Sequence, residues 1–278
     1  MAETVIQWTW RRLPDGTWVK GYSWNPWWGC LKVSEECHHC YAEGIARHYG
    51  HQVWGPAATT PRRHFGDKHW QEPLQWNRQA EQAGHRRSVF CASMADLYED
   101  HPDVVGERQR LWPLIEATPW LNWLLLTKRP ENILAMSPWG RSERWPDNVW
   151  VGTSVGLQRR AAERLPFLLE VPAVVRFVSC EPLLGPLDLL PWLPALQWII
   201  CGGESGLQAR PMNLDWALLL RDQCLAEGVP FFFKQVGGRY HNSGGQLLDG
   251  HTWDALPPEK PGMENTIAQE VQLCPRST

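Results

Sequence analysis

Residues 24–49 of this chain read WNPWWGCLKVSEECHHCYAEGIARHY. Cys30, Cys37 and Cys40 form a C-x6-C-x2-C pattern that leads directly into a predicted helix, and Gly29 allows the chain to turn just before the first thiol. Cys37 and Cys40 are one helical turn apart, so both sulfurs can face one point, while Cys30 can approach that point from the other side of the loop. We therefore predict a metal or cluster site on these three cysteines.

Three thiolates leave one coordination position open, and two kinds of site fit that count. One is a [4Fe–4S] cluster whose fourth iron is free for a substrate or cofactor. The other is a zinc ion whose fourth ligand is water, His38 or His39. Unligated, buried cysteines are a third interpretation, but three thiols so close together beside Gly and Pro disfavour it. The spacing alone does not choose between iron–sulfur and zinc.

The composition is that of an ordinary globular protein, with 21% charged and 43% hydrophobic residues among 278. A net charge of −3 gives no global indication of nucleic-acid binding. The first residues lack the apolar core of a signal peptide, and no apolar run reaches membrane-spanning length. Eight cysteines without a secretion signal indicate a reducing compartment. We therefore expect a cytoplasmic protein with no membrane partner.

Beyond the cysteine stretch the chain repeats one unit, an apolar run followed by a polar cluster and a helix-like segment. The apolar runs are continuous rather than alternating, which is typical of parallel strands covered on both faces. With the strand implied before the cysteine loop, six or seven strands are available. This pattern predicts an α/β fold, a full or partial (β/α) barrel, with a doubly wound open sheet as the alternative. Helices are predicted at 71–84, 107–117, 159–169 and 215–228, the last beginning at Asp215.

We divide the chain into three parts. Residues 1–22 read as an N-terminal β lead-in with a hairpin turn at Asp15-Gly16. Residues 23–238 form the barrel domain, which contains the three-cysteine loop at 30–40. Residues 239–278 form a loop-rich tail, because its prolines, Pro257, Pro258 and Pro261, disfavour a helix.

Polar residues follow each predicted strand, and in barrels and open sheets the carboxyl ends of the strands form the site. The cysteine loop also follows a strand, so we expect the thiols and these polar residues to share one cavity. Cys91, Cys180 and Cys201 lie in or at the ends of strands and are expected to pack in the core, and Cys180 is the best candidate among them for an additional thiol at the site. The polar residues are Ser93, Asp96, Thr127, Lys128, Arg129, Thr153, Ser154, Ser179, Glu181, Glu204, Ser205, Lys234 and Gln235.

Three of these positions carry particular interpretations. Lys234 follows three phenylalanines, and a cation at the end of a buried strand needs an anionic partner such as Glu181, Glu204 or a ligand. Lys128 with its neighbouring arginine could bind a carboxylate or phosphate, or could be surface charge. Gly202-Gly203 permits close backbone approach to a ligand, or forms a plain turn.

Eight segments carry a resemblance to a known family. Together, from Trp24 to Pro257, they resemble the phage-derived three-Cys-motif proteins, usually described as bacteriophage proteins of unknown function. That family is similar in turn to the radical S-adenosylmethionine (SAM) superfamily, in which a cysteine loop follows the first barrel strand. Many members of that superfamily place Tyr after the third cysteine, as Tyr41 stands here. The segments are WNPWWGCLKVSEECHHCYAE, FCASMADLYED, LLTKRPENI, VWVGTSVG, SCEPLLGPLDL, GGESGLQARPM, GVPFFFKQVGG and LDGHTWDALP.

The resemblance implies a partial (β/α) barrel with a [4Fe–4S] cluster on the three cysteines and SAM at the open iron. Such an enzyme cleaves SAM reductively to a 5′-deoxyadenosyl radical, and it needs an electron donor of the flavodoxin or ferredoxin type. The substrate would be a small molecule, a nucleotide or a nucleic acid, and a phage origin favours a nucleotide or nucleic-acid base. The predicted cofactor-binding residues are Ser93, Asp96, Thr153, Ser154, Glu181, Gly202, Gly203 and Glu204. The predicted catalytic residues are Lys128, Glu181 and Lys234.

The chain departs from the superfamily pattern in three places. The first cysteine gap is six rather than three, His39 replaces the usual aromatic residue, and a Gly-Gly-Glu motif is missing after the second strand. Two other functions therefore stay open. One is a zinc protein, with three cysteines and one histidine, that processes or binds nucleic acid. The other is a cluster-bearing protein without catalysis. Trp27 and Trp28 could stack on a base or pack under the loop.

Overall fold

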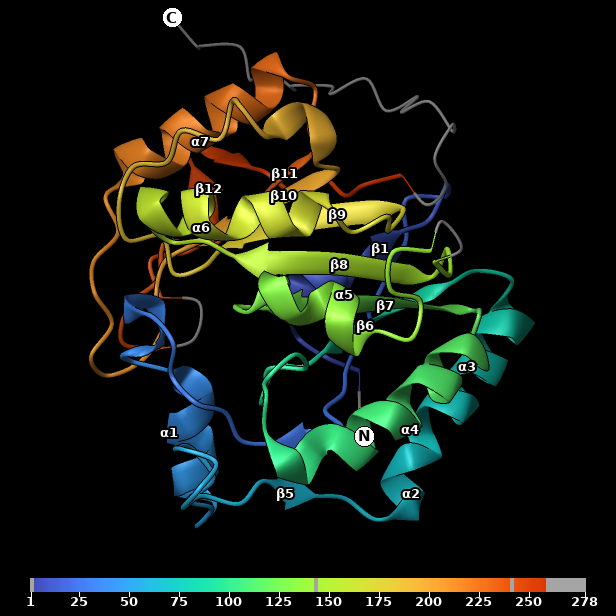
Figure 1. The fold of residues 1–278 in the computed structure, drawn as a ribbon. Coiled ribbons are helices and arrows are strands. Elements are labelled where there is room, and N and C mark those ends of the chain that lie inside the picture. Colours follow the sequence, from blue (N-terminus) through green and yellow to red (C-terminus); the bar gives the residue numbers. More distant parts are fainter. Residues whose placement is uncertain (1–2, 143–144, 241–242, 259–278) are drawn as a thin grey trace, which may run out of the picture.

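The computed structural model describes residues 3–142, 145–240 and 243–258, and its centre is a seven-stranded parallel sheet (Figure 1). The strand order β3-β6-β7-β8-β9-β10-β11 is also the order along the chain. Such an order winds in one direction, as in a barrel, whereas a doubly wound sheet reverses at a switch point. The predicted α/β fold is confirmed, and the barrel is partial, since β3 and β11 are the two edges. The strands are β3 (Tyr22–Ser23), β6 (Arg87–Cys91), β7 (Leu121–Thr127), β8 (Val149–Ser154), β9 (Val175–Cys180), β10 (Trp198–Gly202) and β11 (Phe231–Gln235).

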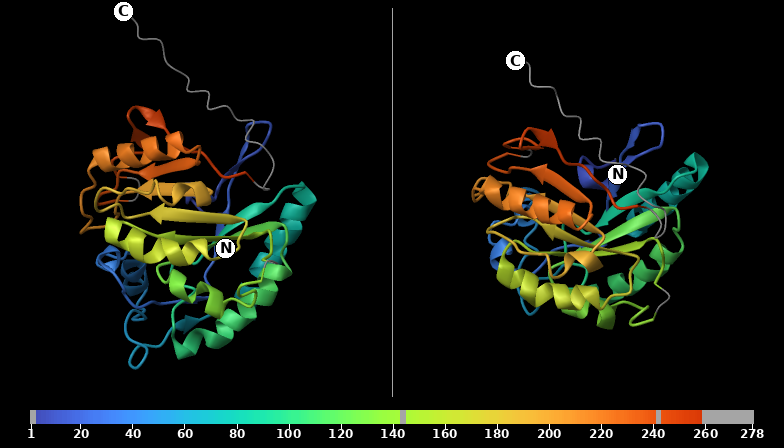
Figure 2. Two further views of the ribbon diagram at one scale, coloured as in Figure 1. Left: turned by 45° about the horizontal axis from the view of Figure 1, so that its top comes forward. Right: turned by 90° about the horizontal axis from the view of Figure 1, so that it is seen from above.

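Helices lie along the outside of this sheet (Figures 1 and 2). The four predicted helices correspond to α3, α4, α6 and α7, with ends within two residues of the prediction. Helix α7 begins at Leu214, one residue before the predicted Asp215. Its N-cap is Asn213, whose side chain accepts a hydrogen bond from Asp215 N at 3.0 Å. The helices are α1 (Tyr41–His48), α2 (Asp67–Trp70), α3 (Glu72–Ala83), α4 (Val105–Glu116), α5 (Ile133–Met136), α6 (Gln158–Leu169) and α7 (Leu214–Ala226).

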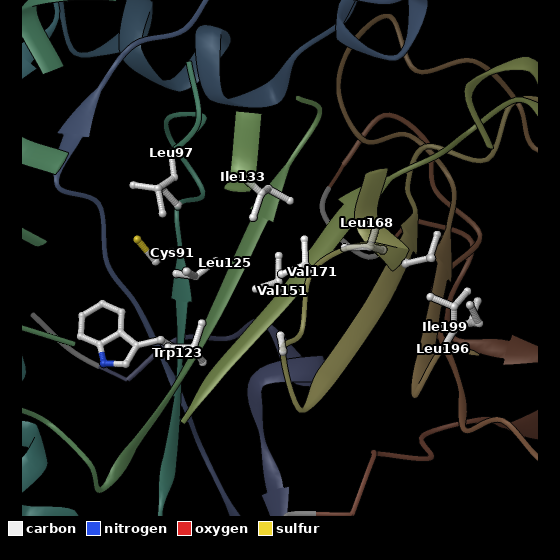
Figure 3. Close-up of a cluster of buried hydrophobic side chains, with 14 of the residues drawn as sticks. Cys91, Leu97, Trp123, Leu125, Ile133, Val151, Leu168, Val171, Leu196 and Ile199 are labelled. Carbon is white, nitrogen blue, oxygen red and sulfur yellow. The ribbon is translucent and has the colours of Figure 1, made fainter. Parts of the chain in front are cut away.

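The outer face of the sheet and the helices form the larger core. Alternate strand residues such as Leu125 and Val151 lie in one buried cluster with Ile133 of α5 and Leu168 of α6 (Figure 3). Cys180 belongs to this cluster and is fully buried. The interpretation of Cys180 as a core residue is therefore confirmed, and it adds no thiol to the site, because the strand alternation turns it toward the helices.

The inner face of the sheet closes around a tryptophan from the N-terminal segment. Trp8, in the 3-10 helix Gln7–Thr9, packs edge-on against Phe90 of β6 at 4.6 Å and lies 6.2 Å from Trp198 of β10. One side chain reaches strands near opposite edges, so the sheet is curved around it. The other inner-face residues of this second cluster include Leu124, Trp150, Phe177, Ile200 and Phe232.

Short antiparallel pairs flank the barrel. The hairpin predicted at Asp15-Gly16 is confirmed, between β1 (Arg11–Arg12) and β2 (Trp18–Val19), with Gly16 at φ +86°. A second pair, β4 (Trp27–Trp28) with β5 (Arg63–His64), lies beside the cysteine loop. In the tail, β12 (Leu247–Leu248) pairs with β13 (His251–Thr252), while Pro261 lies outside the described residues. The three-part division of the chain stays a prediction.

None of the helices in the described ranges has both the length and the apolar character that crossing a membrane would require.

Candidate functional site

The three cysteines line one cavity of about 160 Å³, into which the carboxyl ends of the parallel strands project. The cavity brings together residues that lie far apart in the sequence, from the cysteine loop to the end of β11. Nine of the predicted polar residues share it with Cys30, Cys37 and Cys40. They are Ser93, Asp96, Thr127, Lys128, Arg129, Ser154, Ser179, Glu181 and Lys234.

The period of two along a strand decides which predicted residue faces the cavity. Ser154 lies four residues after Trp150 of β8, and Ser179 lies two residues after Phe177 of β9. Both serines therefore point to the same inner face as these aromatic residues, and both line the cavity. Thr153 is fully buried on the opposite side, where its hydroxyl donates to Thr127 O at 2.9 Å. Gln235 also points away, donating to Gly203 O at 3.1 Å. Of the two adjacent polar residues at the end of β8, and likewise at the end of β11, only one therefore faces the cavity.

Buried contacts hold the first thiol in place. Gly29 has φ +122°, and a Cβ there would lie 2.4 Å from Val53 O, so only glycine fits before Cys30. Leu31 N donates to Glu99 Oε1 at 2.7 Å. Glu99 is in turn paired with Arg62 at 2.8 Å, and both side chains are almost completely buried. The start of the cysteine loop is thus anchored to a buried ion pair.

The second half of the loop is anchored in the same way by Glu36, whose side chain is fully buried. Its carboxylate accepts hydrogen bonds from Gly156 N at 2.8 Å and from Arg164 Nη1 at 3.0 Å. Cys37 ends a 3-10 helix, Glu35–Cys37, whereas Cys40 is the N-cap of α1 with ψ 115°. The prediction that these two cysteines share one helical turn is wrong, because the backbone leaves the helical conformation between them.

Asp96 is held entirely by donors of the protein. Its two oxygens accept from Thr127 Oγ1 at 2.6 Å, Lys128 N at 3.0 Å, Arg129 Nη1 at 2.8 Å and Tyr98 N at 3.1 Å. Burial acts against the charged form, but the Arg129 guanidinium and these hydrogen bonds outweigh it and lower the pKa of Asp96. Asp96 therefore organises the strand ends, and its oxygens are already engaged.

Lys234 and Glu181 form an ion pair at the cavity wall. Lys234 Nζ lies 2.8 Å from Glu181 Oε1, so the predicted anionic partner of this lysine is confirmed. Ser179 Oγ donates to the other carboxylate oxygen at 3.1 Å. A Cβ on Gly202 would lie 3.1 Å from Glu181 Oε1, and one on Gly203 would lie 1.8 Å from Val236 O. The two glycines thus allow other parts of the protein, rather than a ligand, to pack closely against the backbone at this point.

Glu204 lies outside the cavity lining and pairs with Arg210 at 2.6 Å. Its other oxygen lies 3.1 Å from His39 Nδ1. Burial opposes the charged form, yet the hydrogen bonds from Arg210 and His39 lower the pKa of Glu204. His39 is therefore oriented by Glu204, on the side of the loop beside the third cysteine.

The three thiols have different electrostatic surroundings. Burial raises the pKa of Cys30 to about 12, and Asp96 adds to this shift while Arg129 opposes it. Burial also raises the pKa of Cys40. At Cys37 burial acts in the same direction, but the Lys128 ammonium and hydrogen bonds outweigh it and lower the pKa. Cys37 is thus the thiol most readily deprotonated.

The donor set of three thiols at one cavity suits a [4Fe–4S] cluster with an open iron or a zinc ion that takes a fourth ligand. One zinc ion with thiolates at about 2.3 Å needs its sulfurs about 4 Å apart. Among the described residues, no three Cys, His, Asp or Glu side chains are grouped closely enough to hold one metal ion. All seven described cysteines are free thiols.

Sequence reasoning missed several residues that build the site. Trp8 lines the cavity from the N-terminal segment, and no local signal marks it. Glu36 and Arg164 form the loop anchor, and the position of Glu36 beside Cys37 was the available signal. The two predicted stacking residues differ, since Trp27 is fully buried and Trp28 is half-buried with the Arg63 guanidinium 4.5 Å from its ring.

Three solved structures of spore photoproduct lyase are similar to this chain. A double mutant with bound AdoMet and dinucleoside spore photoproduct has 11% identity, with 78% of this chain and 63% of that chain covered and a TM-score of 0.41. Two single mutants have 10% and 11% identity, TM-scores of 0.39 and 0.38, and coverage of 71% and 73% of this chain. The chain spans about three fifths of the length of these proteins, 58% and 60% of the two single mutants.

No curated protein matches this chain. One protein-family model does match, over residues 5–257, and its description is "Protein of unknown function (DUF5131)". The match includes the cysteine loop, every strand of the parallel sheet and the hairpin of the tail. The phage origin stays a prediction. Since the match extends over most of its length, the chain belongs to the DUF5131 family.

Proposed function

We propose that this chain is an iron–sulfur enzyme of radical SAM type. The observation that carries the proposal is the single cavity in which Cys30, Cys37 and Cys40 meet the polar residues of several strand ends. Three cysteines in one loop leave an open iron on a [4Fe–4S] cluster, and the open iron is where a cofactor would bind. The loop is anchored at both ends by buried ion pairs, which favours a preformed site.

In this proposal the three cysteines hold the cluster. When bound, the cluster would supply the electron that cleaves SAM to a 5′-deoxyadenosyl radical. Lys128, close enough to lower the pKa of Cys37, favours its thiolate form. Arg129 Nη1 lies 3.7 Å from Cys30 Sγ and favours the thiolate there.

The residues proposed to hold SAM are those whose polar groups line the cavity. Ser154 Oγ accepts from Lys128 Nζ at a long 3.4 Å, and a ligand can replace this contact. The Glu181 carboxylate can accept from an amino group or ribose hydroxyls. Ser93 Oγ accepts from Ser23 and Asn25, which leaves its own hydrogen as a donor to share. Asp96 lines the cavity with its oxygens already engaged, whereas the other four predicted cofactor-binding residues lie outside the cavity lining and are proposed to support it from behind. They are Thr153, Gly202, Gly203 and Glu204.

Lys128, Glu181 and Lys234 remain the proposed catalytic residues. The pair of Lys234 with Glu181 places an ammonium and a carboxylate 2.8 Å apart at the cavity wall. Either member of such a pair can exchange a proton with a substrate. When Glu181 accepts a proton the pair gains one positive charge, and when Lys234 donates a proton the pair loses one. An electron donor of the flavodoxin or ferredoxin type is the proposed partner, and a small molecule, nucleotide or nucleic acid is the proposed substrate.

The test is anaerobic reconstitution with iron and sulfide, followed by incubation with SAM and a strong reductant. We expect near-stoichiometric cluster content, and 5′-deoxyadenosine that disappears when any of Cys30, Cys37 and Cys40 is replaced by Ala. The matched control is Cys224→Ala, which removes a buried thiol of α7 outside the cavity. A protein that holds one zinc ion tightly and assembles no cluster would refute the proposal.

A further inference from the structure

A second, larger cavity of about 480 Å³ opens beside the cysteine cavity, and we refer to it as the outer groove. The two cavities share Leu31, Val33, Lys128 and Arg129 as lining residues. The other lining residues are Ala57, which precedes β5, and residues of α6 and of the segments that follow β6 and β7. Its volume falls within the range of about 300–1,000 Å³ that small-molecule sites occupy.

Most charges that line the outer groove are neutralised within the protein. Arg129 pairs with Asp96 at 2.8 Å, Arg164 with Glu36 at 3.0 Å, and Arg160 with both Glu35 and Glu163. Glu99 pairs with Arg62. These groups fix the walls, and a ligand would have to break an existing ion pair to use them.

Lys128 differs from the other cations of the outer groove. In residues 3–142, 145–240 and 243–258 no carboxylate pairs with its ammonium, whose hydrogen-bond partner is Ser154 Oγ at 3.4 Å. Its side chain is half-buried and lies where the two cavities meet. Asp100 and Glu131 also line the groove, but both are exposed, so water and salt screen them. A half-buried cation of this kind favours an anionic ligand group.

Apolar side chains lie on both walls of the outer groove. Leu31 and Val33 of the cysteine loop are each 39% exposed, and Phe167 of α6 is 45% exposed. Apolar groups that line a concave site bury the body of a ligand, while a few polar groups orient it. The groove thus offers apolar surface beside one available positive charge.

We propose that the outer groove is the substrate site and that its ligand is a small organic anion. The ligand has an apolar or aromatic body against Leu31, Val33 and Phe167, and its phosphate or carboxylate group binds Lys128 Nζ. This inference rests on the proposed function, because a substrate of the cysteine cavity must lie beside it. Phosphate and carboxylate share the anionic chemistry that the lysine recognises.

The test is calorimetric titration of the full-length protein with phenyl phosphate and with benzoate. Benzyl alcohol, which lacks the charge, and inorganic phosphate, which lacks the body, serve as comparison ligands. Wild-type protein is expected to bind at least one aromatic anion about tenfold or more tightly than either comparison ligand. The anion that binds with the higher affinity identifies the preferred acidic group, phosphate or carboxylate.

Three variants distinguish binding in the outer groove from binding elsewhere on the protein surface. Lys128→Gln is expected to weaken binding of the aromatic anion by about tenfold or more, and Phe167→Ser is expected to weaken this binding several-fold. Lys68→Gln, an exposed lysine of α2, is the matched control and should bind like wild type. Circular dichroism melting curves check that each variant is folded.

Three results would overturn the inference. They are no measurable binding of either anion, equal binding by Lys128→Gln and wild type, and displacement of the probe by SAM in reconstituted protein. Cluster assembly is measured separately, by iron content and absorbance. A chain that binds the probe through Lys128 but assembles no cluster would refute the proposed function, whereas cluster-dependent SAM cleavage without probe binding would refute only the outer groove.

Discussion

The anchor of the cysteine loop gives a prediction that does not depend on any bound group. Glu36→Gln keeps the shape of the side chain but removes its charge, and this leaves the Arg164 guanidinium buried without its partner. The Glu36 side chain is 0% exposed and that of Arg164 is 6% exposed, so water cannot replace the lost interaction. Breaking a buried ion pair from one side costs about 3–5 kcal/mol, a large part of the roughly 5–15 kcal/mol that stabilises a typical domain.

Guanidinium unfolding of the metal-free protein, followed by tryptophan fluorescence, measures this free energy. The matched control is Arg159→Gln, which breaks an ion pair of 2.8 Å with Glu35 in the same segment. The Arg159 side chain is 63% exposed, so the expected loss there is only about 0–1 kcal/mol. The double variant Glu36→Gln/Arg164→Met removes both charges and should be more stable than Glu36→Gln alone, because no unpaired charge stays buried.

Either of two results would refute this reasoning. If Glu36→Gln lost no more free energy of unfolding than Arg159→Gln, the pair would not anchor the loop. Additive losses in the double variant would lead to the same conclusion, since interacting residues give non-additive changes.

Three further predictions concern other parts of the barrel. Asp96 has a pKa in the folded state that lies below its unfolded value of about 3.9. The stability that Asp96 contributes is therefore present above the unfolded pKa and is lost as the pH falls through the folded pKa. Asp96→Asn should lower the melting temperature at pH 7, and the melting temperature of this variant should fall less steeply in acid than that of wild type. Gly203→Ala would place a Cβ 1.8 Å from Val236 O and should cost about 3 kcal/mol or more of folding stability. Gly44→Ala, in α1 with open space around it, should instead stabilise the protein by about 0.5–1 kcal/mol. Denaturant midpoints measure both changes, and equal effects of the two variants would contradict the packing argument. Trp8→Ala should cost about 3–5 kcal/mol, because it empties the centre of the barrel, and an unchanged midpoint would mean that Trp8 does not support the curvature of the sheet.

Much of the fold followed from the sequence because its signals are local. Continuous apolar runs such as 121–127 have the length and composition of buried parallel strands. The helices between them carry their own end signals, for example Gly84 in the left-handed conformation at the end of α3. Strand and helix alternate in an order that allows only a few topologies. Helix α7 begins one residue before the predicted Asp215, because Asn213 and Asp215 can both mark the start of a helix.

The sequence by itself determined that three thiols lie in one loop and that polar residues follow the strands. Only the tertiary structure decided which of those residues face the cavity, because a side chain one position along a strand points to the opposite face. Ser154 thus lines the cavity and Thr153 does not. Partners distant in the sequence, such as Glu36 with Arg164 and Trp8 with Phe90, could not be read from spacing, since curvature and burial bring them together.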